Sequence, residues 1–529
     1  MWQDDWRDKV WALLGQPWDV IIVGGGITGA GALRAATHLG LRTLLVEKRD
    51  FAWGTSSRST KLVHGGLRYL AQGQFAVTRE SVRERERLVR EAPGLVEPLG
   101  FLVPTYNGAS PSKHSVGLGL AAYDLFAHKW DHPYLKGDDF LFLAPHIRSH
   151  QLKGGFRYLD SVTDDARLVL RVIREAVRDG GTALNYASAD RVLLGNDGRV
   201  NGILVRDVAA ERTAELHSRV VINATGPWTD RLRDQVGGEA RIRPSRGSHL
   251  IFPAWRLPVA QAITLVHPQD RRPVFVLPWE GATVAGTTDL DHSQSLDQEP
   301  RISSEEVNYL MAALDAFFPS LSLQPGDAIA SFAGVRPLVS AGKSDPSKVS
   351  RAHALWQEHG LITITGGKLT TFRRMAVDTL NAVRHLLPDP PVAGHRIPML
   401  EPIALELAGA PSLDSRARRR LVGRYGAEAL AVVASALPGE VERVPGTDLL
   451  WAELRWAARS EGVVHLDDLL LRRVRLGLLL PHGAIPLLDE VRGIVQPELG
   501  WQDAKWEAEV ARYLGIWVQG YSLPACRSA

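Results

Sequence analysis

The sequence predicts an α/β protein in which a Rossmann-type parallel-sheet domain is combined with an antiparallel-sheet domain and a C-terminal helical domain. Three observations predict this class. A strand, glycine turn, helix and second strand begin near residue 19, short apolar runs alternate with turn residues from 249 to 289, and the pattern beyond 401 is helical. With 529 residues, the chain is also too long for one compact domain.

The first unit contains a fingerprint for binding a dinucleotide. The apolar run 19–23 is typical of a buried parallel strand, a helical stretch reaches His38, and a second run, 43–46, ends at Glu47. Residues 24–29 have the spacing G-x-G-x-x-G between that first strand and the helix, which is the context that the fingerprint requires.

Each residue of this fingerprint has its own physical role. Gly24 permits the tight turn, and Gly26 lets the backbone approach a pyrophosphate, whose charge the helix N-terminus favours. Gly29 lets the helix and strand pack closely, and Glu47 would accept hydrogen bonds from an adenosine ribose.

Three later segments favour FAD over NAD as the cofactor. The polar segment 55–62 suits a ribityl and phosphate chain, and the strand 220–222 returns to the nucleotide at Ala224-Thr225-Gly226. Gly366-Gly367-Lys368 opens a late helix whose N-terminal dipole would face the carbonyl edge of a reduced flavin.

Other stretches indicate the surface and the linkers. The charged run 83–87 lies in a predicted helix and is interpreted as a solvated face. The proline-rich stretch 387–391 is typical of a linker that precedes a separate helical domain.

Composition excludes several classes of protein. The net charge of +3 is too small to indicate nucleic-acid binding, and the single cysteine, Cys526, cannot form an intramolecular disulfide, which suits a reducing compartment. Residues 1–5 lack a signal-peptide pattern, and no apolar run approaches the roughly 20 residues that span a bilayer. Any membrane contact would therefore be peripheral.

Two segments are candidates for such contact. Trp2, Trp6 and Trp11 recur at helical spacing, and this face either lies in a membrane interface or packs on the protein's own body. The basic segment 471–475 with the apolar run 476–480 is the other candidate, although a core-facing helix with an exposed basic side is the preferred interpretation.

Six motifs resemble those of the FAD-dependent, aerobic and membrane-associated glycerol-3-phosphate dehydrogenases. The resemblance runs from about residue 19 to 380, and the C-terminal part looks more loosely like the family's helical cap. Ala352 departs from the acidic residue that the family often has after Arg351, which puts the orientation of that arginine in doubt. The motifs follow the glycine fingerprint in family order at 54–70, 223–228, 247–249, 286–289, 334–338 and 366–371.

The resemblance implies a fold and an activity. The expected fold is an α/β FAD-binding domain of the glutathione-reductase/amino-acid-oxidase-like kind, with an antiparallel-sheet substrate domain. The implied reaction is oxidation of sn-glycerol 3-phosphate to dihydroxyacetone phosphate by hydride transfer from C2 to FAD, with electrons passed to a quinone-type acceptor. The expected segments are 15–75, 161–245 and 331–386 for the FAD-binding domain, 76–160 and 246–330 for the substrate domain, and 400–529 for the cap.

The motifs also nominate residues that bind the cofactor. They are Gly24, Gly26, Thr28, Gly29, Glu47, Thr55, Ser56, Ser57, Lys61, Leu62, His64, Gly65, Ala224, Gly226, Trp228, Gly334, Gly367, Lys368, Leu369 and Thr370.

A phosphate ester that is nearly a dianion needs several cations around it. The resemblance nominates as substrate-binding residues Arg68, Arg336, Arg351 and Lys368, with Tyr69 as a neutral donor.

Removing a hydride from C2 also requires a base for the C2 hydroxyl proton, and histidine is the usual choice. We favour His249 as the base and His64 as a flavin contact, while a purely structural role for either histidine stays open. Lys368 or Arg336 would stabilise negative charge that develops on the C2 oxygen, which completes the expected catalytic set.

Three alternative functions remain at this point. An oxidase would pass the electrons to oxygen, an amine-oxidising enzyme of the glycine-oxidase class would share the FAD fold, and a non-catalytic flavin-binding protein would need only the nucleotide motif. The absence of a long insertion favours the dehydrogenase over the oxidase, and the cationic motifs argue against the other two. We expect neither a metal ion nor a nucleic-acid partner. We expect a homodimer and a cytoplasmic location at the inner face of the membrane.

Overall fold

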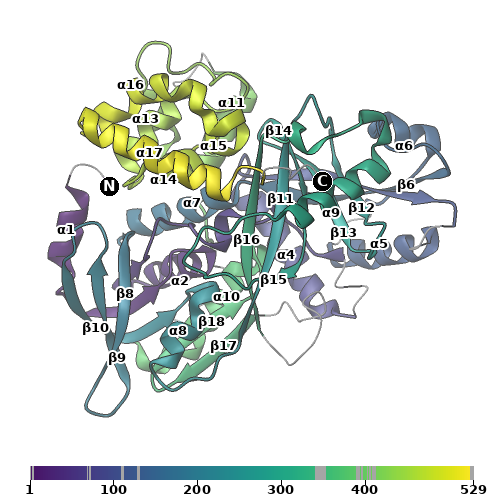
Figure 1. The fold of residues 1–529 in the computed structure, drawn as a ribbon. Coiled ribbons are helices and arrows are strands. Elements are labelled where there is room, and N and C mark those ends of the chain that lie inside the picture. Colours follow the sequence, from purple (N-terminus) through teal and green to yellow (C-terminus); the bar gives the residue numbers. More distant parts are fainter. Residues whose placement is uncertain are drawn as a thin grey trace.

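The computed structural model describes residues 2, 5–67, 70, 73–108, 112–127, 131–339, 353–388, 394, 397–401, 403, 407 and 413–524. Two sheets and a C-terminal helical region make up the fold (Figure 1). The first sheet lies in the lower left part of that view, and the second stands beside it and extends to the right.

The first sheet contains a parallel core. Its strand order is β17-β18-β10-β1-β2-β7, with the hairpin of β8 and β9 attached to β10. The strands are β1 (Trp18–Val23), β2 (Thr43–Val46), β7 (Thr182–Leu184), β8 (Ala187–Leu194), β9 (Val200–Asp207), β10 (Thr213–Asn223), β17 (His353–Glu358) and β18 (Leu361–Gly366).

The carboxyl ends of three parallel strands meet at one edge of this sheet. Val23 of β1 is in register with Val46 of β2 and with Asn223 of β10, and Asn223 is in register with Thr363 of β18. All six residues of β1 are buried, because helices cover one face of the parallel core and apolar residues of β8 and β9 pack against the other. Ligands bind at such an edge in open α/β sheets.

Helices α2, α7 and α10 pack together over the parallel core. Gly31 of α2 allows this approach, because a Cβ at that position would lie 2.8 Å from the ring of Phe372 in α10. The helices of this part are α1 (Trp6–Leu13), α2 (Ile27–His38), α7 (Asp165–Arg178), α8 (Thr229–Asp234) and α10 (Phe372–Ala382).

The second sheet confirms the antiparallel pattern expected between 249 and 289. Its order is β15-β11-β14-β13-β12-β4-β6-β3, with β16 paired to β11 and β5 paired to β6. The strands are β3 (Leu62–Val63), β4 (Val96–Tyr106), β5 (Tyr134–Lys136), β6 (Leu152–Thr163), β11 (Ile242–Pro253), β12 (Ala262–Val266), β13 (Pro273–Trp279), β14 (Ala282–Gly286), β15 (Leu290–Asp291) and β16 (Ala330–Val339). Its helices are α4 (Phe75–Glu91), α5 (Lys113–Ala127), α6 (Gly137–Leu143) and α9 (Ser304–Phe317).

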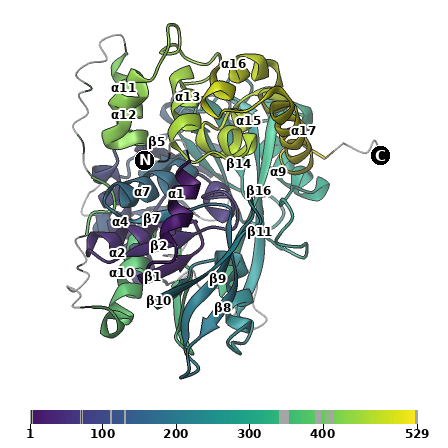
Figure 2. The same ribbon diagram turned by 90° about the vertical axis from the view of Figure 1, so that its left-hand side faces the viewer.

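The C-terminal region is helical throughout its described residues, apart from turns and two isolated bridges, Arg443 with Leu450 and Glu461 with Trp2. Figures 1 and 2 show it stacked above the first sheet, with α17 reaching toward β16. Its helices are α11 (Ser415–Tyr425), α12 (Ala429–Ala434), α13 (Trp451–Ser460), α14 (Leu466–Asp468), the π-helix η9 (Leu469–Arg473), α15 (Leu476–Leu479), α16 (Leu488–Glu498) and α17 (Asp503–Gly520).

The structure corrects our interpretation of the charged run 83–87. Glu84 and Arg85 are buried, although the run alternates in charge as a solvated face does. Glu84 pairs with Arg373 of α10, and Arg85 donates to Asp160 of β6 at 2.8 Å. Helix α4 therefore joins the two sheets through these pairs.

The basic segment 471–475 was also misjudged. It does lie in a core-facing helix, but its basic side is buried rather than exposed, with Arg472, Arg473 and Arg475 each at most 2% exposed. Arg472 and Arg473 donate to Asp50, which follows β2, so the helical region is tied to the first sheet by buried ion pairs.

The N-terminal tryptophans pack on the protein's own body, which was one of the two alternatives. Trp2 is buried and stacks 5.2 Å from Phe51, and the ring of Trp6 lies 5.4 Å from that of Trp2. The indole of Trp11 donates to Asp207 at 2.5 Å. Trp2 of the first candidate segment and the three arginines of the second are therefore used in packing inside the protein.

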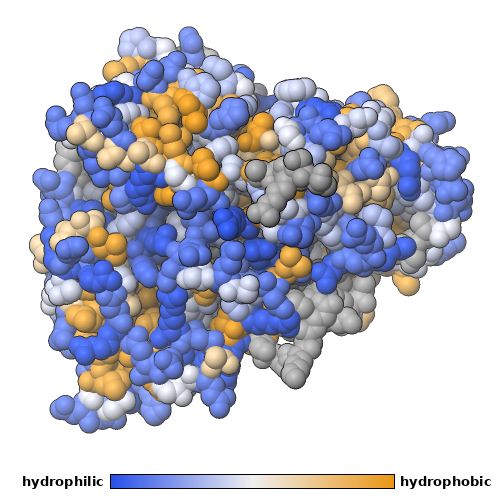
Figure 3. Space-filling view, viewed as in Figure 1, coloured by the Kyte–Doolittle hydropathy of each residue, from blue (hydrophilic) through white to orange (hydrophobic). Residues whose placement is uncertain are grey.

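Within the described residues, no helix combines the length and apolar character that a membrane span requires. Hydrophilic residues cover most of the face in Figure 3, and the largest hydrophobic group on it lies over the C-terminal helical region.

Candidate active site

The glycine turn after β1 leaves no space for side chains. Gly24 has a φ of +115°, and a Cβ there would lie 2.6 Å from the carbonyl oxygen of Ala224. A Cβ on Gly29 would overlap the carbonyl oxygen of Gly24. The backbone of the turn is thus held between β1, β10 and α2, with the N-terminus of α2 at its end, where anions are favoured.

Glu47 lies at the end of β2 beside this turn. Its carboxylate accepts hydrogen bonds from the backbone nitrogens of Gly25 at 2.7 Å and Arg49 at 2.8 Å. Burial raises the pKa of Glu47, and these two hydrogen bonds oppose that rise. Glu47 lines the adjoining cavity, and its two oxygens can each accept a further hydrogen bond there.

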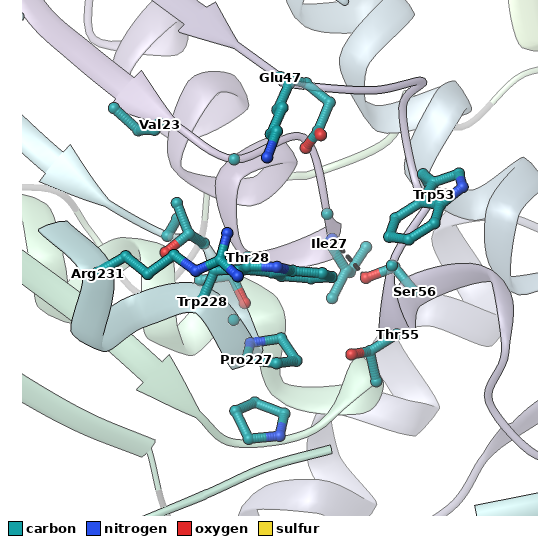
Figure 4. Close-up of a pocket in the computed structure, with 18 of the residues that line it drawn as sticks. Val23, Ile27, Thr28, Glu47, Trp53, Thr55, Ser56, Pro227, Trp228 and Arg231 are labelled. Atoms are coloured by element: carbon teal, nitrogen blue, oxygen red, sulfur yellow. Dashed lines mark hydrogen bonds between the residues drawn. The ribbon is translucent and has the colours of Figure 1, made fainter. Parts of the chain in front are cut away.

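A cavity of about 400 Å³ opens at this edge of the first sheet. Figure 4 shows Trp228, Pro227 and Arg231 on one side of it and Trp53, Thr55 and Ser56 on the other, with Glu47 above. Ser56 accepts a hydrogen bond from the backbone nitrogen of Ile27 at 2.9 Å, so the loop after β2 is fastened to the N-terminus of α2.

Thirteen of the residues expected at the site line this one cavity, although they come from five separate stretches of the chain, 24–28, 47–56, 224–228, 336 and 367–369. They are Gly24, Gly26, Thr28, Glu47, Thr55, Ser56, Ala224, Gly226, Trp228, Arg336, Gly367, Lys368 and Leu369. The other described candidates do not line it: Gly29, Ser57, Lys61, Leu62, His64, Gly65, His249, Gly334 and Thr370. Arg68, Tyr69 and Arg351 lie outside the described residues.

Lys61 is a buried anchor of the loop after β2. Its side chain is fully buried, and its Nζ donates to both carboxylate oxygens of Asp165 at 2.9 Å and to the carbonyl of Ser57 at 2.7 Å. Burial lowers the pKa of Lys61 to about 8, although the charge of Asp165 opposes this. Its amine is thus engaged in shaping the loop that borders the cavity.

Arg336 of β16 has its guanidinium directed by a neighbouring turn. Its Nη2 donates to Thr287 at 2.9 Å, and its Nη1 donates to Asp289 at 3.1 Å. Gly247 of β11 makes room for it, because a Cβ there would overlap the guanidinium. The two motifs 247–249 and 286–289 therefore meet around this one arginine.

Lys368 precedes η6 (Leu369–Thr371) and α10. Gly366 and Gly367 both have positive φ, which turns the chain sharply after β18 and brings Lys368 to the cavity. Its Nζ donates to Ser81 of α4 at 2.9 Å, and Thr370 donates to the carbonyl of His64 at 3.4 Å. The late glycine motif is thereby connected to the segment that contains His64.

His249 lies on β11 and is 1% exposed. Its Nε2 is 3.0 Å from Oγ1 of Thr60, and its ring stacks on Phe332 at 4.5 Å. Burial lowers the pKa of His249 well below 6.5, and the charges of Arg336 and Lys61 lower it further. The imidazole is therefore neutral at neutral pH.

Asp297 and Trp53 also line the cavity, although the sequence motifs did not predict them as site residues. Asp297, from the loop after β15, forms ion pairs with Lys48 at 3.3 Å and with Arg231 at 2.9 Å. The pKa of its carboxyl is lowered to about 2, chiefly by the hydrogen bond with Arg231. Trp53 lines the same part of the cavity, with Arg49 stacked 4.0 Å from its ring centroid. Trp53 directly precedes a quoted motif, whereas nothing in the sequence near Asp297 indicates its partners.

The cavity is lined by groups that suit a dinucleotide. It offers a helix N-terminus and glycine backbone for a pyrophosphate and a carboxylate for a ribose, and Arg336 and Lys368 supply cations at another part of its lining.

Comparisons with known proteins agree with this arrangement. Residues 19–373 match the family model described as FAD dependent oxidoreductase, and residues 389–506 match the C-terminal domain of alpha-glycerophosphate oxidase. The chain is 36% identical to glycerol-3-phosphate dehydrogenase 2 of Mycobacterium tuberculosis, covering 96% of this chain and 89% of that protein. It is 38% identical to the aerobic glycerol-3-phosphate dehydrogenase of Bacillus subtilis over 70% of this chain and 67% of that one.

A solved structure resembles almost the whole chain. The glycerol-3-phosphate dehydrogenase of Bacillus halodurans complexed with FAD has a TM-score of 0.77 and 29% identity, and 98% of each chain is covered. The L-alpha-glycerophosphate oxidase of Mycoplasma pneumoniae, at 18% identity and a TM-score of 0.58, covers 72% of this chain and shares the fold. The cofactor of this protein is FAD, and the chain belongs to the FAD-dependent glycerol-3-phosphate dehydrogenase family.

Proposed function

We propose that this protein oxidises sn-glycerol 3-phosphate to dihydroxyacetone phosphate, with hydride leaving C2 for FAD. The observation that supports it best is the position of two cations, Arg336 and Lys368, in the lining of the cavity that holds the glycine turn. A dinucleotide site alone does not need them, whereas a substrate that carries a phosphate does.

The cations would orient the substrate. Arg336 is held on one side by Thr287 and Asp289, so its guanidinium has a fixed direction before any ligand binds. Fixing the phosphate places C2 at a defined position, which converts binding free energy into orientation. FAD, when bound, supplies the atom that accepts the hydride. Arg336 or Lys368 also stabilises charge on the C2 oxygen.

His249 would accept the proton of the C2 hydroxyl. Its imidazole is neutral, so it has a lone pair available, and its pKa responds to the charge of Arg336. His64 would contact the flavin, since its backbone carbonyl is joined to Thr370 in the last cofactor motif. Arg68, Tyr69 and Arg351 remain proposed substrate ligands on the basis of the family motifs alone.

Anaerobic mixing of the purified yellow protein with sn-glycerol 3-phosphate tests the substrate. We expect rapid loss of the visible flavin absorbance, and none with glycerol or glycine. Flavin that stays oxidised would exclude this substrate. The variant Arg336→Lys keeps one charge but loses the forked donors, so KM should rise at least about tenfold and kcat should fall. Steady-state constants equal to those of the wild type would remove Arg336 from the site.

We also propose that a quinone, rather than oxygen, takes the electrons. Dehydrogenases are the curated relatives that match this chain at 36–38% identity, whereas the oxidase structure is only 18% identical. Turnover in air with a soluble quinone analogue should reduce the quinone and produce little hydrogen peroxide. Peroxide formed in step with substrate oxidation would instead assign an oxidase.

A quinone acceptor requires peripheral attachment to the inner face of the membrane, which the family resemblance also implies. Sedimentation with vesicles of bacterial lipids should carry the protein into the pellet. Protein that stays in the supernatant at low ionic strength would contradict attachment to lipid.

A further inference from the structure

We propose that Thr60 is a positioning residue that sets the tautomer of His249, so that Nδ1 is the nitrogen that receives the substrate proton. This inference rests on the proposed function, in which His249 is the base. Thr60 stands in none of the expected catalytic, substrate-binding or cofactor-binding sets.

The two ring nitrogens of His249 have different surroundings. Nε2 lies 3.0 Å from Oγ1 of Thr60, and that is the single hydrogen-bond contact of the ring within the described part of the chain. Nδ1 is buried and has no hydrogen-bond partner among the described residues. An unsatisfied buried nitrogen costs about 1–3 kcal/mol, so a substrate hydroxyl that bonds to Nδ1 would remove this cost.

The ring cannot easily turn to exchange these surroundings. Phe332 of β16 stacks on one face, 4.5 Å away and inclined by 11°. Gly286 of β14 lies against its Cδ2 edge, where even a Cβ would overlap the ring. With the ring plane confined in this way, the partner at Nε2 decides which nitrogen carries the proton.

Thr60 is itself held in place from both sides. The backbone nitrogen and the hydroxyl of Ser59 donate to Asp165 at 2.9 and 2.7 Å. Lys61 donates to the same buried carboxylate. Because both neighbours are anchored to Asp165, the hydroxyl of Thr60 is presented to the imidazole at a fixed position.

A neutral imidazole has one N–H and one lone pair. If Oγ1 of Thr60 accepts the Nε2–H, the lone pair is on Nδ1, the nitrogen without a partner. The proton of the C2 hydroxyl then moves from oxygen to Nδ1 as the C2–H electron pair leaves as hydride for FAD. The charged groups facing the ring are Arg336 from β16 and Lys61 from the loop after β2, and both disfavour a second proton on the ring in the resting protein.

Two variants separate the hydroxyl from the shape of the side chain. Thr60→Ser retains the hydroxyl, and Thr60→Val retains the shape without it. We expect Thr60→Val to slow anaerobic flavin reduction at least about tenfold, with KM changed less than about threefold. Thr60→Ser should stay within about threefold of the wild type. Equal rates in Thr60→Val and the wild type would overturn the inference.

A second measurement does not depend on turnover. The ¹⁵N chemical shifts of a neutral imidazole distinguish a protonated from an unprotonated ring nitrogen, and His249→Gln assigns the signals in histidine-labelled holoenzyme. We expect protonated Nε2 and unprotonated Nδ1 in the wild type and in Thr60→Ser, and loss of this preference in Thr60→Val. Protonated Nδ1 in the wild type would overturn the inference.

If His249 is not the base, the variants give a different set of rates. If His249→Gln reduces its flavin as fast as the wild type, His249 is not the base, whatever the Thr60 variants do. If His249→Gln is slow while Thr60→Val matches the wild type, the base stands and only the role of Thr60 fails.

Discussion

Asp50→Asn should lower the free energy of unfolding, because the Asp50 carboxylate forms buried ion pairs with Arg472 and Arg473. Asp50 is fully buried and accepts from Arg472 at 2.6 Å and from Arg473 at 2.6 and 2.7 Å. Asparagine keeps the shape but removes the negative charge between two buried guanidiniums. Breaking one side of a buried ion pair costs about 3–5 kcal/mol, and we expect a loss of this size in the free energy of unfolding.

The same carboxylate predicts a dependence on pH. Burial alone would raise the pKa of Asp50, but Arg473 and Arg472 outweigh it and hold the value at about 2, below the ordinary 3.8. A carboxyl whose folded pKa is lowered stabilises the protein above its unfolded pKa, and this contribution is lost as the pH falls. About 2 kcal/mol should therefore disappear between about pH 4 and pH 2, and the difference between wild type and Asp50→Asn should shrink there.

Urea unfolding of the holoenzyme, followed by circular dichroism at pH 7 and at pH 3, measures both effects. The control is Asp291→Asn, because Asp291 pairs with Arg243 at the surface and its side chain is 58% exposed. Solvent screens such a pair, so its loss should cost less than about 1 kcal/mol. Equal midpoints for Asp50→Asn and Asp291→Asn at pH 7 would refute the argument that the buried pairs hold the two regions together.

Three further substitutions follow from the geometry of the site. Gly29→Ala forces a methyl group onto the carbonyl of Gly24, so the purified protein should contain less than about half of the wild-type flavin by absorbance. Gly247→Ala displaces the guanidinium of Arg336, so KM for sn-glycerol 3-phosphate should rise about tenfold while the flavin content is kept. Asp297→Asn removes the carboxylate charge that pairs with Lys48 and Arg231 at the cavity. Because both ion pairs are partly exposed, FAD should dissociate only about two- to fivefold faster, as measured by fluorescence.

Matched controls accompany these three variants. Gly515→Ala places a methyl group in open space on α17, so its flavin content and kinetics should equal those of the wild type. Asp291→Asn controls for the loss of a surface carboxylate near Asp297 in the chain. Flavin content in Gly29→Ala equal to that in Gly515→Ala, an unchanged KM in Gly247→Ala, or equal FAD dissociation from Asp297→Asn and Asp291→Asn would each contradict the corresponding prediction.

The sequence by itself determined those strands, turns and helices that depend on residues close together along the chain. A glycine fingerprint directly after an apolar strand predicts a turn, a helix N-terminus and a ligand edge, because positive φ and close packing can be inferred from neighbours along the chain. The strands β1 and β2, the helix α2 and the antiparallel pattern from 249 to 289 were predicted in this way and are confirmed. The motif order likewise indicated that Arg336 and Lys368 belong with the nucleotide turn, and both line its cavity.

Only the tertiary structure decided which charges are buried and which side chains they meet. Arg85, Arg472 and Arg473 look like solvated residues in the sequence, yet each is paired in the interior. Asp50 lies more than 400 residues from the two arginines that hold it. An alternating or basic run has the same local pattern whether water or a distant carboxylate faces it, and the difference in free energy comes from desolvation and from partners that folding brings together. The contact of Thr60 with His249, separated by 189 positions, arises for the same physical reason.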